Sequence, residues 1–306
     1  MSDAAQTNPL PLAGEGRVRA VRTHDRTGLI TLFQVAPLTL LLIAFVVVPL
    51  AAIVIVSFLD YDSVRILPRF VLQNYADLLF SPVTWRTYFN TLRYAAIVWA
   101  ITLVLGFFVA YVLAFLVSGA LWQTILFLVC TIPFLTSNII RMIAWVPFLG
   151  REGLLNRALL SLGFVDRPLE FLLFSDFAVV LAFVHLYTLF MVVPIFNTMM
   201  RIDRRLIEAA VDGGAGPFQV LRTVIIPLSK SGIAIGSVFV ITLVMGDFAT
   251  VRLMSGGQSA SVGLMIANGI SLMQYPAACA NAVILLAVVL LLIFAILRIV
   301  DIRKEL

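Results

Sequence analysis

The residues able to do acid–base, nucleophilic or metal chemistry are few and scattered along this chain. The only histidines are His24 and His185, and His185 lies in a long apolar segment, where it is best interpreted as a hydrogen-bonded packing residue. No His, Cys, Asp and Glu cluster has the spacing of a metal site, and no G-x-x-x-x-G-K-[ST] phosphate loop is present. A nucleophilic triad would have to be assembled from isolated residues. We therefore expect neither a catalytic centre nor a metal site.

Polar side chains inside apolar segments are the second kind of candidate site. A charged group in a bilayer costs roughly 2.5–3.5 kcal/mol on insertion scales, so it is expected to face a pore or a partner. Asp247 follows Gly246 near the end of one apolar segment, and Asn138 and Arg141 lie together in another. We expect these three side chains to line a substrate path, with Asp247 attracting a cation. The alternatives are a snorkelling Arg141, an interfacial Asp247, or an ion pair between Asp247 and Arg252 or Arg141.

The composition indicates which elements must position these residues. Of the 306 residues, 62% are hydrophobic and 12% are charged, and the mean hydropathy is +1.08. A soluble domain of this size needs more charged surface, so the solvent of most of the chain is lipid. A spanning helix needs roughly 20 apolar residues, and lipid-exposed backbone must be helical. We expect an all-α integral membrane protein with six spans, at about 31–58, 92–117, 122–148, 174–199, 231–251 and 279–300.

Lysine and arginine set the expected orientation, because they are enriched in cytoplasmic loops. They are more frequent in residues 1–26, in the loop 201–230 and at the C-terminus than in the other loops. Both termini and the loop 201–230 are therefore predicted to be cytoplasmic. Because residues 1–26 are polar, we expect 1–29 to form a disordered cytoplasmic tail ahead of a membrane domain at 30–306. The net charge of +5 then reflects topology, and no nucleic-acid partner is expected.

The loop 201–230 is predicted to contain a first short helix. Asp203 can cap a helix that runs over about 204–212. Gly213 or Gly214 can end it, since one of them can adopt a positive φ at the C-terminal cap. Small and apolar side chains alternate with charges along this helix, so another protein surface could approach its backbone closely.

A second short helix is expected after the first. Pro217 suits its first position, where a missing N–H costs nothing, and the helix should run through Val224 and end at Pro227. Composition alone also fits a pair of helices that lie on the membrane surface. A polar loop of this length between bilayer-length apolar runs nevertheless favours a soluble docking partner.

The sequence of this loop resembles the EAA loop of ABC-importer permeases, the inner-membrane components of binding-protein-dependent transport systems. The matching residues are Glu208, Ala209, Ala210, Gly214 and Pro227, followed by Gly232-Ile233 at the start of an apolar run. Two details differ, because Ile226 precedes Pro227 and Ser231 stands where a second proline is common. From Asn90 to about residue 300 the chain is most similar to the spermidine/putrescine permease group. The resemblance implies the type I ABC-importer permease fold, with a coupling loop at 201–230 between helices 4 and 5.

The resemblance also implies a division of labour among several chains. The five matching residues would dock the permease onto an ATPase, and ATP and Mg would be bound by two separate ATPase subunits. A second permease subunit, most simply a different but related chain, would complete the pore. A periplasmic binding protein would deliver a small, polyamine-like solute across a bacterial inner membrane. This chain itself would be no enzyme and would bind no cofactor.

Other functions remain open at this point. Related permeases serve iron, thiamine, phosphonates and opines, so the cargo is not fixed by the resemblance. A stand-alone ion-coupled secondary transporter or channel would need internal repeats and several intramembrane ionisable groups, and the chain offers no clear repeat and few such groups. A membrane-embedded enzyme would need the catalytic constellation that the sequence lacks.

Overall fold

The computed structural model describes residues 26–62 and 65–300 of the chain. Residues 1–25, the greater part of the tail predicted over 1–29, lie outside the described residues, and a helix begins at Arg26. Contacts between residues divide the chain into two units, 1–51 and 52–306. The second unit contains every candidate site residue, so it carries the rest of the argument.

The first described elements, up to the second predicted span, are two helices, a hairpin and two further helices. They are α1 (Arg26–Leu42), a π-helical turn (Ile43–Val47), α2 (Val48–Ser57), β1 (Leu59–Asp62), β2 (Arg65–Phe70), α3 (Gln73–Phe80), α4 (Pro82–Tyr111) and a second π-helical turn (Val112–Leu116). The hairpin is antiparallel, with Asp62 opposite Arg65. It is a small strand element in a chain whose composition predicts helices alone.

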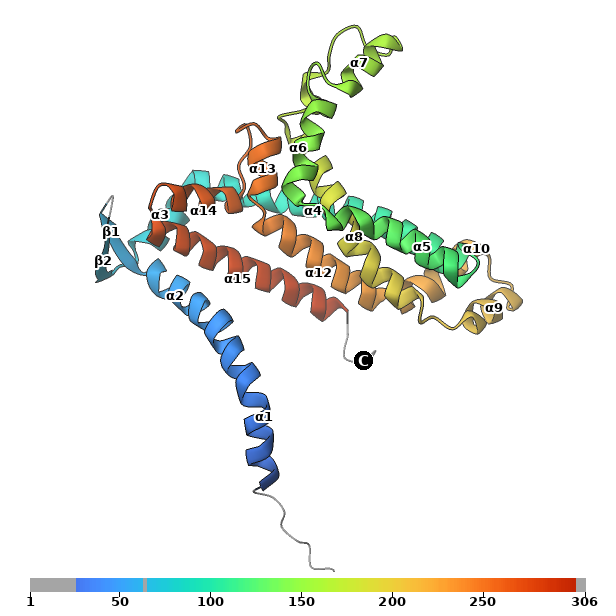
Figure 1. The fold of residues 1–306 in the computed structure, drawn as a ribbon, viewed down its shortest axis with the longest axis horizontal. Coiled ribbons are helices and arrows are strands. Elements are labelled where there is room, and N and C mark those ends of the chain that lie inside the picture. Colours follow the sequence, from blue (N-terminus) through green and yellow to red (C-terminus); the bar gives the residue numbers. More distant parts are fainter. Residues whose placement is uncertain (1–25, 63–64, 301–306) are drawn as a thin grey trace, which may run out of the picture. The chain divides into compact units, whose positions relative to one another are not determined.

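The remaining elements are all helical. They are α5 (Ala120–Thr131), a 3₁₀ turn (Ile132–Leu135), α6 (Asn138–Leu149), α7 (Leu154–Ser161), a 3₁₀ turn (Glu170–Leu172), α8 (Asp176–Met199), α9 (Arg204–Asp212), α10 (Pro217–Val220), a π-helical turn (Leu221–Ile225), α11 (Ile226–Leu228), α12 (Lys230–Gly246), α13 (Ala249–Met254), α14 (Val262–Ser271) and α15 (Tyr275–Ile299). Figure 1 shows their order along the chain.

Within residues 26–62 and 65–300, four continuous helical segments are long and apolar enough to cross a membrane. They are Gln34–Ser57, Pro82–Leu116, Glu170–Met199 and Tyr275–Arg298. The second begins ten residues before the span predicted at 92–117. The Ser81 side chain accepts a hydrogen bond from the Thr84 amide and Pro82 occupies the first turn, so the helix starts within a polar stretch that hydropathy alone leaves out.

Two further spans exist only if bent pairs of helices are each taken as one crossing. The uninterrupted helix predicted at 122–148 is wrong, because the segments Ala120–Leu135 and Asn138–Ser161 meet at 88°. Pro133 lies in the 3₁₀ turn, and Thr136 and Ser137 leave the helical region of backbone conformations. A proline removes an N–H and clashes with the preceding turn, so the chain changes direction there.

The helix predicted at 231–251 is also shorter than expected. It ends at Gly246, because Asp247 has an extended backbone and its side chain accepts from the Thr250 amide at 2.9 Å. An aspartate that caps a new helix competes with continuation of the old one. The residues after it form the separate helix α13, which places Asp247 at a junction between two helices.

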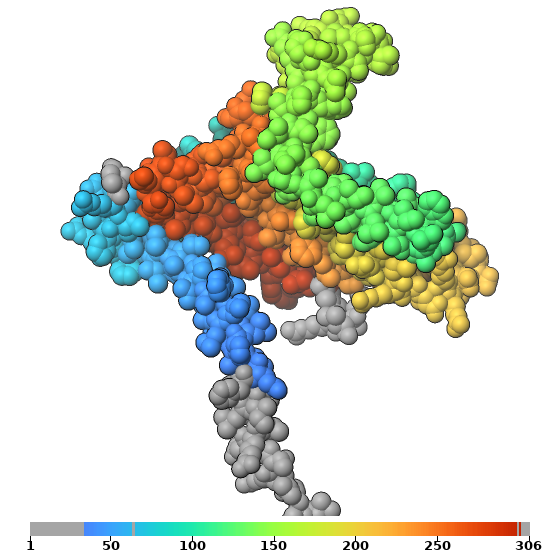
Figure 2. All heavy atoms as spheres, viewed as in Figure 1, coloured from blue at the N-terminus to red at the C-terminus, as the bar shows by residue number. Residues whose placement is uncertain are grey.

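The core is made where α4, α8 and α12 pack together (Figure 1). Met191 of α8 is fully buried, and its side chain lies against Gly106 of α4 and Gly236 of α12. An added Cβ at either glycine would lie 2.7 Å from a Met191 side-chain atom. Small residues at helix crossings let backbones approach closely in membranes, so this methionine between two glycines fixes the three-helix contact. The surfaces of α12 and α15 also adjoin, as Figure 2 shows in orange and red.

Replacing Gly232 with alanine is expected to destabilise this packing by about 1–3 kcal/mol, the usual cost of overpacking. The new Cβ would lie 2.5 Å from the Pro194 carbonyl oxygen and 2.9 Å from Ile195 Cα, and backbone atoms of α8 cannot move aside as a flexible side chain can. Thermal unfolding of the purified protein in detergent measures the effect. The matched control is Gly246→Ala on the same helix, where no atom lies within 4 Å of the added Cβ. Equal melting of both variants would contradict the prediction.

Candidate functional site

The helix α9 begins and ends at the residues that the sequence indicates. The Asp203 carboxylate accepts a hydrogen bond from the Arg205 amide at 3.0 Å. At the other end Gly214 has a φ of +85°, and the Ala215 amide donates to the Ala210 carbonyl at 3.0 Å. This six-to-one bond around a left-handed glycine is the Schellman arrangement. Gly214 is therefore the glycine that ends the helix.

The residues of α9 divide into an outer and an inner face. Glu208 and Ala209 are exposed, whereas Ile207 and Ala210 are half-buried and pack on the core. The geometry thus leaves Ala209 and part of Glu208 open to another protein, although Glu208 also lines a cavity toward α4, while Ala210 packs on its own chain. The part of all these residues in docking remains a prediction.

The second helix of the loop is longer than predicted. The helical segment Pro217–Leu228 continues through Pro227, and the end expected at that proline is wrong. A π-helical turn, Leu221–Ile225, comes immediately before α11. This wider turn accommodates the missing N–H and the ring of the proline. Pro227 is half-buried, and the change of direction comes instead at Ser229, where the segment meets α12 at 66°.

A cavity of about 390 Å³ separates α9 from the end of α4. The side of α9 that lines it includes Arg204, Ile207, Glu208 and Val211. Tyr111 and the π-helical turn after α4 contribute aromatic side chains to the opposite side. The helix α9 is therefore not packed against α4 along its whole length, which leaves room for it to shift.

Asp247 is held by hydroxyl and amide donors and by neither of the two nearby arginines. Its Oδ2 accepts from the Tyr187 hydroxyl at 2.6 Å and from Thr250 Oγ1 at 2.7 Å. In the described part of the chain no ion pair joins it to Arg141 or Arg252. The carboxylate is half-buried, and its ligands are all neutral. A charge with only neutral partners at a helix junction can still attract a cation.

Arg141 and Asn138, predicted together, are in direct contact. The Arg141 Nη2 donates to Asn138 Oδ1, and the guanidinium carbon lies 5.5 Å from the centroid of the Phe134 ring. Its Nε and Nη1 are covered but have no acceptor among the described residues. The Tyr187 hydroxyl lies within electrostatic range of both Arg141 and Asp247. Hydrogen bonds thus join Asp247 to Tyr187 and Arg141 to Asn138, as two separate pairs.

His185 has the packing role that its sequence context indicates. Its Nδ1 accepts from Trp145 Nε1 at 3.0 Å, and the two rings meet edge to face. Both side chains line a cavity of about 300 Å³ together with Arg141 and Phe148. This cavity has an aromatic wall and one guanidinium beside it.

A polar cluster around Asp176 was missed by sequence reasoning. The Asp176 carboxylate accepts from the Arg93 guanidinium, the Tyr94 hydroxyl and the Ser259 hydroxyl. The Asn90 amide adds a bond of 2.7 Å to the Ala260 carbonyl. These contacts tie α4 and the first turn of α8 to the segment between α13 and α14. The only signal in the sequence is an acid one residue after a helix-capping serine, which does not reveal partners 83 residues away.

The arrangement as a whole suits recognition and movement more than covalent chemistry. Among residues 26–62 and 65–300, no three metal-ligating side chains come together. The intramembrane polar groups are a carboxylate, a guanidinium, an amide and hydroxyls on the long apolar helices or at their junctions. Such groups can hold or repel a charged solute. The exposed face of α9 lies apart from them, on the loop between α8 and α12.

Sequence comparison finds curated relatives over most of the chain, although no family model matches it. The spermidine/putrescine transport system permease protein PotB of Haemophilus influenzae is 32% identical over 261 residues, which cover 84% of this chain and 89% of that protein. PotB of Escherichia coli K12 is 32% identical over 259 residues, covering 84% and 93%. The osmoprotective compounds uptake permease protein GgtC of Synechocystis is 29% identical over 265 residues, covering 83% and 93%.

Structural comparison finds the same fold in a solved transporter. A chain of a bacterial ABC transporter involved in the import of the acidic polysaccharide alginate superposes with a TM-score of 0.71 at 16% identity, covering 89% of this chain and 95% of that one. The same kind of transporter, in complex with an alginate pentasaccharide-bound periplasmic protein, gives a TM-score of 0.70. At this identity the likeness establishes the fold alone.

Proposed function

The chain belongs to the PotB-like family of ABC-transporter permeases, and from this premise we propose that it forms the path for a small polyamine-like solute through the inner membrane. The names of its curated relatives support the cargo class. The half-buried Asp247 carboxylate supports it independently, since it can attract an ammonium group in a path that carries cations. The chain is a translocating subunit.

We infer that α9 docks the permease onto an ATPase subunit. The observation that carries this assignment is the exposed Glu208–Ala209 face on a helix that is capped at both ends. A short, rigid helix can pass a movement of the ATPase on to the membrane helices. The small side chain of Ala209 lets the surface of the ATPase approach the helix backbone closely. ATP and Mg are bound by two ATPase subunits in this proposal, and Glu208 transmits motion without doing chemistry.

Two more partners complete the proposed importer. A second permease subunit, a related chain, supplies the other half of the pore, and a periplasmic binding protein delivers the solute. The structural neighbour in complex with a substrate-bound periplasmic protein supports this last contact. The bias of Lys and Arg supports a cytoplasmic position for the termini and for the loop that holds α9.

The mechanism that fits these parts is alternating access. When the ATPase subunits close, the two docking helices approach each other and the helical bundle opens outward to accept the solute. Hydrolysis lets the bundle return to the inward-facing state. The cavity of about 390 Å³ beside α9 gives that helix room to shift during the cycle.

Reconstitution tests the proposal directly. The chain is co-expressed with its candidate ATPase and second permease, and uptake of labelled spermidine and putrescine into proteoliposomes is measured with and without ATP. We expect ATP-dependent uptake, and loss of the co-purified ATPase in Glu208→Ala. The exposed side chain of Gln219, on the second helix of the same loop, provides the control variant Gln219→Ala. Uptake that persists without ATP and without an ATPase would show a stand-alone secondary transporter instead.

A further inference from the structure

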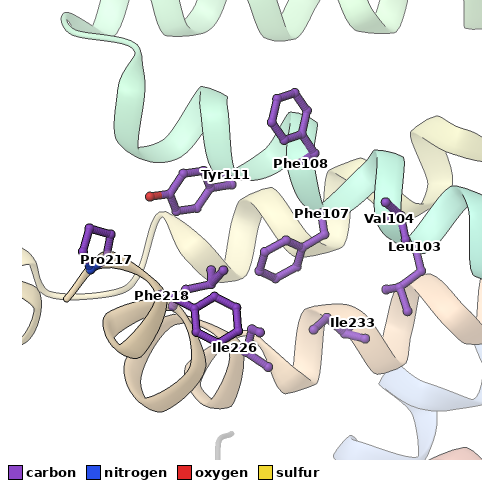
Figure 3. Close-up of a pocket in the computed structure, with 10 residues that line it drawn as sticks. Leu103, Val104, Phe107, Phe108, Tyr111, Pro217, Phe218, Ile226 and Ile233 are labelled. Carbon is purple, nitrogen blue, oxygen red and sulfur yellow. The ribbon is translucent and has the colours of Figure 1, made fainter. Parts of the chain in front are cut away.

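An apolar cavity of about 730 Å³ lies between α4 and the segment that leads from α10 into α12 (Figure 3). Leu103, Phe107 and Tyr111 lie on its α4 side, and Phe218 and Ile233 lie opposite. The only polar side-chain group among its lining residues is the Tyr111 hydroxyl. The cavity is therefore suited to a hydrocarbon chain and not to a polar solute.

The cavity differs from the ordinary lipid-facing exterior because it is concave and lies between two elements. Three of its large side chains are strongly exposed: Phe218 at 75%, Val104 at 69% and Phe108 at 65%. Its α4 wall belongs to the bilayer-length segment Pro82–Leu116. Water is a poor occupant of such a space, and burial of apolar surface favours filling it with an apolar chain.

Two basic residues interrupt the stripe of side chains on the loop side of the cavity. The five residues of this stripe are Phe218, Arg222, Ile226, Lys230 and Ile233. Arg222 lies four residues from both Phe218 and Ile226 in the segment Pro217–Leu228, and Lys230 lies three residues before Ile233 on α12, beyond the 66° bend, so each basic residue neighbours a cavity-lining residue on its own helical segment. Three of the five line the cavity. Arg222 and Lys230 are exposed, and within the described residues neither side chain makes a hydrogen bond or an ion pair.

We propose that this cavity is a binding site for an anionic phospholipid. An acyl chain fills the apolar space, and the phosphate is held by Arg222 and Lys230. Basic residues at the membrane edge between helices bind anionic headgroups, and Arg pairs well with phosphate oxygens. The complementarity of charge at the edge and apolar lining within selects an anionic lipid over a zwitterionic one.

The site also lies directly behind the docking helix. Tyr111 and Pro217 line both this cavity and the neighbouring cavity of about 390 Å³ that Glu208 lines. A lipid in the larger cavity would hold these two shared walls in place and so limit the shift of α9. This regulatory consequence rests on the proposed function, whereas the binding of the lipid does not.

Native mass spectrometry of the purified transporter complex tests the binding. Phosphatidylglycerol and phosphatidylcholine with identical acyl chains are added in turn, and bound lipid is counted. We expect preferential retention of phosphatidylglycerol. The double variant Arg222→Gln/Lys230→Gln should weaken it about thirtyfold, because two basic groups near an anionic headgroup are removed at once. The matched control is Arg201→Gln/Arg205→Gln, which removes two exposed charges of the same loop that lie outside the segments lining the cavity, whereas Arg222 and Lys230 lie within three or four residues of lining side chains on those segments. Equal retention of both lipids, or equal loss in both double variants, would overturn the proposal.

A second measurement identifies the occupant of the apolar space. A photoactivatable crosslinker is attached to Val104→Cys in the assembled transporter, and the adducts are analysed by mass. We expect phospholipid adducts, and an adduct with a second permease chain alone would overturn the proposal.

The transport assay is run on the same samples. Lipid binding without ATP-dependent uptake would leave the site intact and contradict only the proposed function.

Discussion

Replacing Gly214 with valine is expected to lower ATP-dependent uptake about tenfold, with a parallel loss of the co-purified ATPase. Gly214 ends α9 with a φ of +85°, a conformation that costs a β-branched residue about 1–3 kcal/mol. A cost near 1.4 kcal/mol shifts a two-state population tenfold. Because nothing lies within 4 Å of its Cβ position, the valine strains the backbone without a steric clash. The expected failure is therefore in the geometry of α9, the helix proposed to dock, and not in the packing of the core.

Gly216→Val is the matched control for this experiment. Gly216 has a φ of −71° and a ψ of 164°, an extended conformation that valine adopts readily and that suits a residue before proline. Its Cβ position is also free of neighbours within 4 Å. Uptake, ATPase recovery and thermal unfolding are measured for both variants in detergent or proteoliposomes. If the two variants behave alike, the left-handed glycine has no special part in docking.

The bounds of α9 are the part of the fold that sequence reasoning predicts best. Its signals are local, because Asp203 caps the amide of a residue two positions on and Gly214 ends the helix within one turn. Pro227 shows the limit of the same reasoning. A proline normally ends a helix, but the π-helical turn before it lets the helix continue to Leu228. Nothing in the composition of that turn distinguishes it from an ordinary helix.

The sequence predicts six spans, but the described residues hold four continuous ones and two more only if each bent pair of helices is one crossing. Hydropathy identifies stretches that must lie in lipid, yet the break at residues 136–137, just after the 3₁₀ turn Ile132–Leu135, lies within a stretch without any charged residue. Proline is tolerated in many spanning helices, so Pro133 alone did not reveal the 88° change of direction. The start of α4 at Pro82 was missed for the opposite reason, because its first turns are polar and hydropathy excludes them.

The sequence singles out individual candidate path residues but does not reveal how they are arranged. Asp247, Arg141 and Asn138 stand out because they are polar in apolar surroundings. Tyr187 does not stand out, although its hydroxyl binds the Asp247 carboxylate from 60 residues away. Asp176 does not stand out either, although its carboxylate accepts from side chains of α4 and of the segment before α14. Long-range hydrogen bonds depend on how the helices pack, and a single sequence carries no direct signal of that packing.

Asp247→Asn is expected to raise the KM for uptake of a cationic solute about tenfold or more. The substitution keeps the size of the side chain and an acceptor for the Thr250 amide, but it removes the negative charge. A charge pair 4 Å apart at an effective dielectric constant near 20 interacts with about 4 kcal/mol, of which a third corresponds to a tenfold change. Initial uptake rates over a range of spermidine concentrations, in reconstituted transporter, give the KM.

Tyr187→Phe separates this electrostatic role from a structural one. It removes the hydroxyl that donates to Asp247 at 2.6 Å but leaves the carboxylate charged. Loss of this bond is expected to lower stability by about 1 kcal/mol, with little change in KM. Asp247→Asn removes the charge and also replaces one carboxylate oxygen with an NH₂ group, which cannot accept a hydrogen bond from a hydroxyl. Both variants should therefore unfold at a lower temperature, while only Asp247→Asn loses affinity for the cation.

If the KM changes equally in the two variants, or stays unchanged in Asp247→Asn, the carboxylate serves the helix junction and not the solute. A KM raised only in Asp247→Asn assigns the charge to the substrate path, because hydrogen bonding has then been varied without effect.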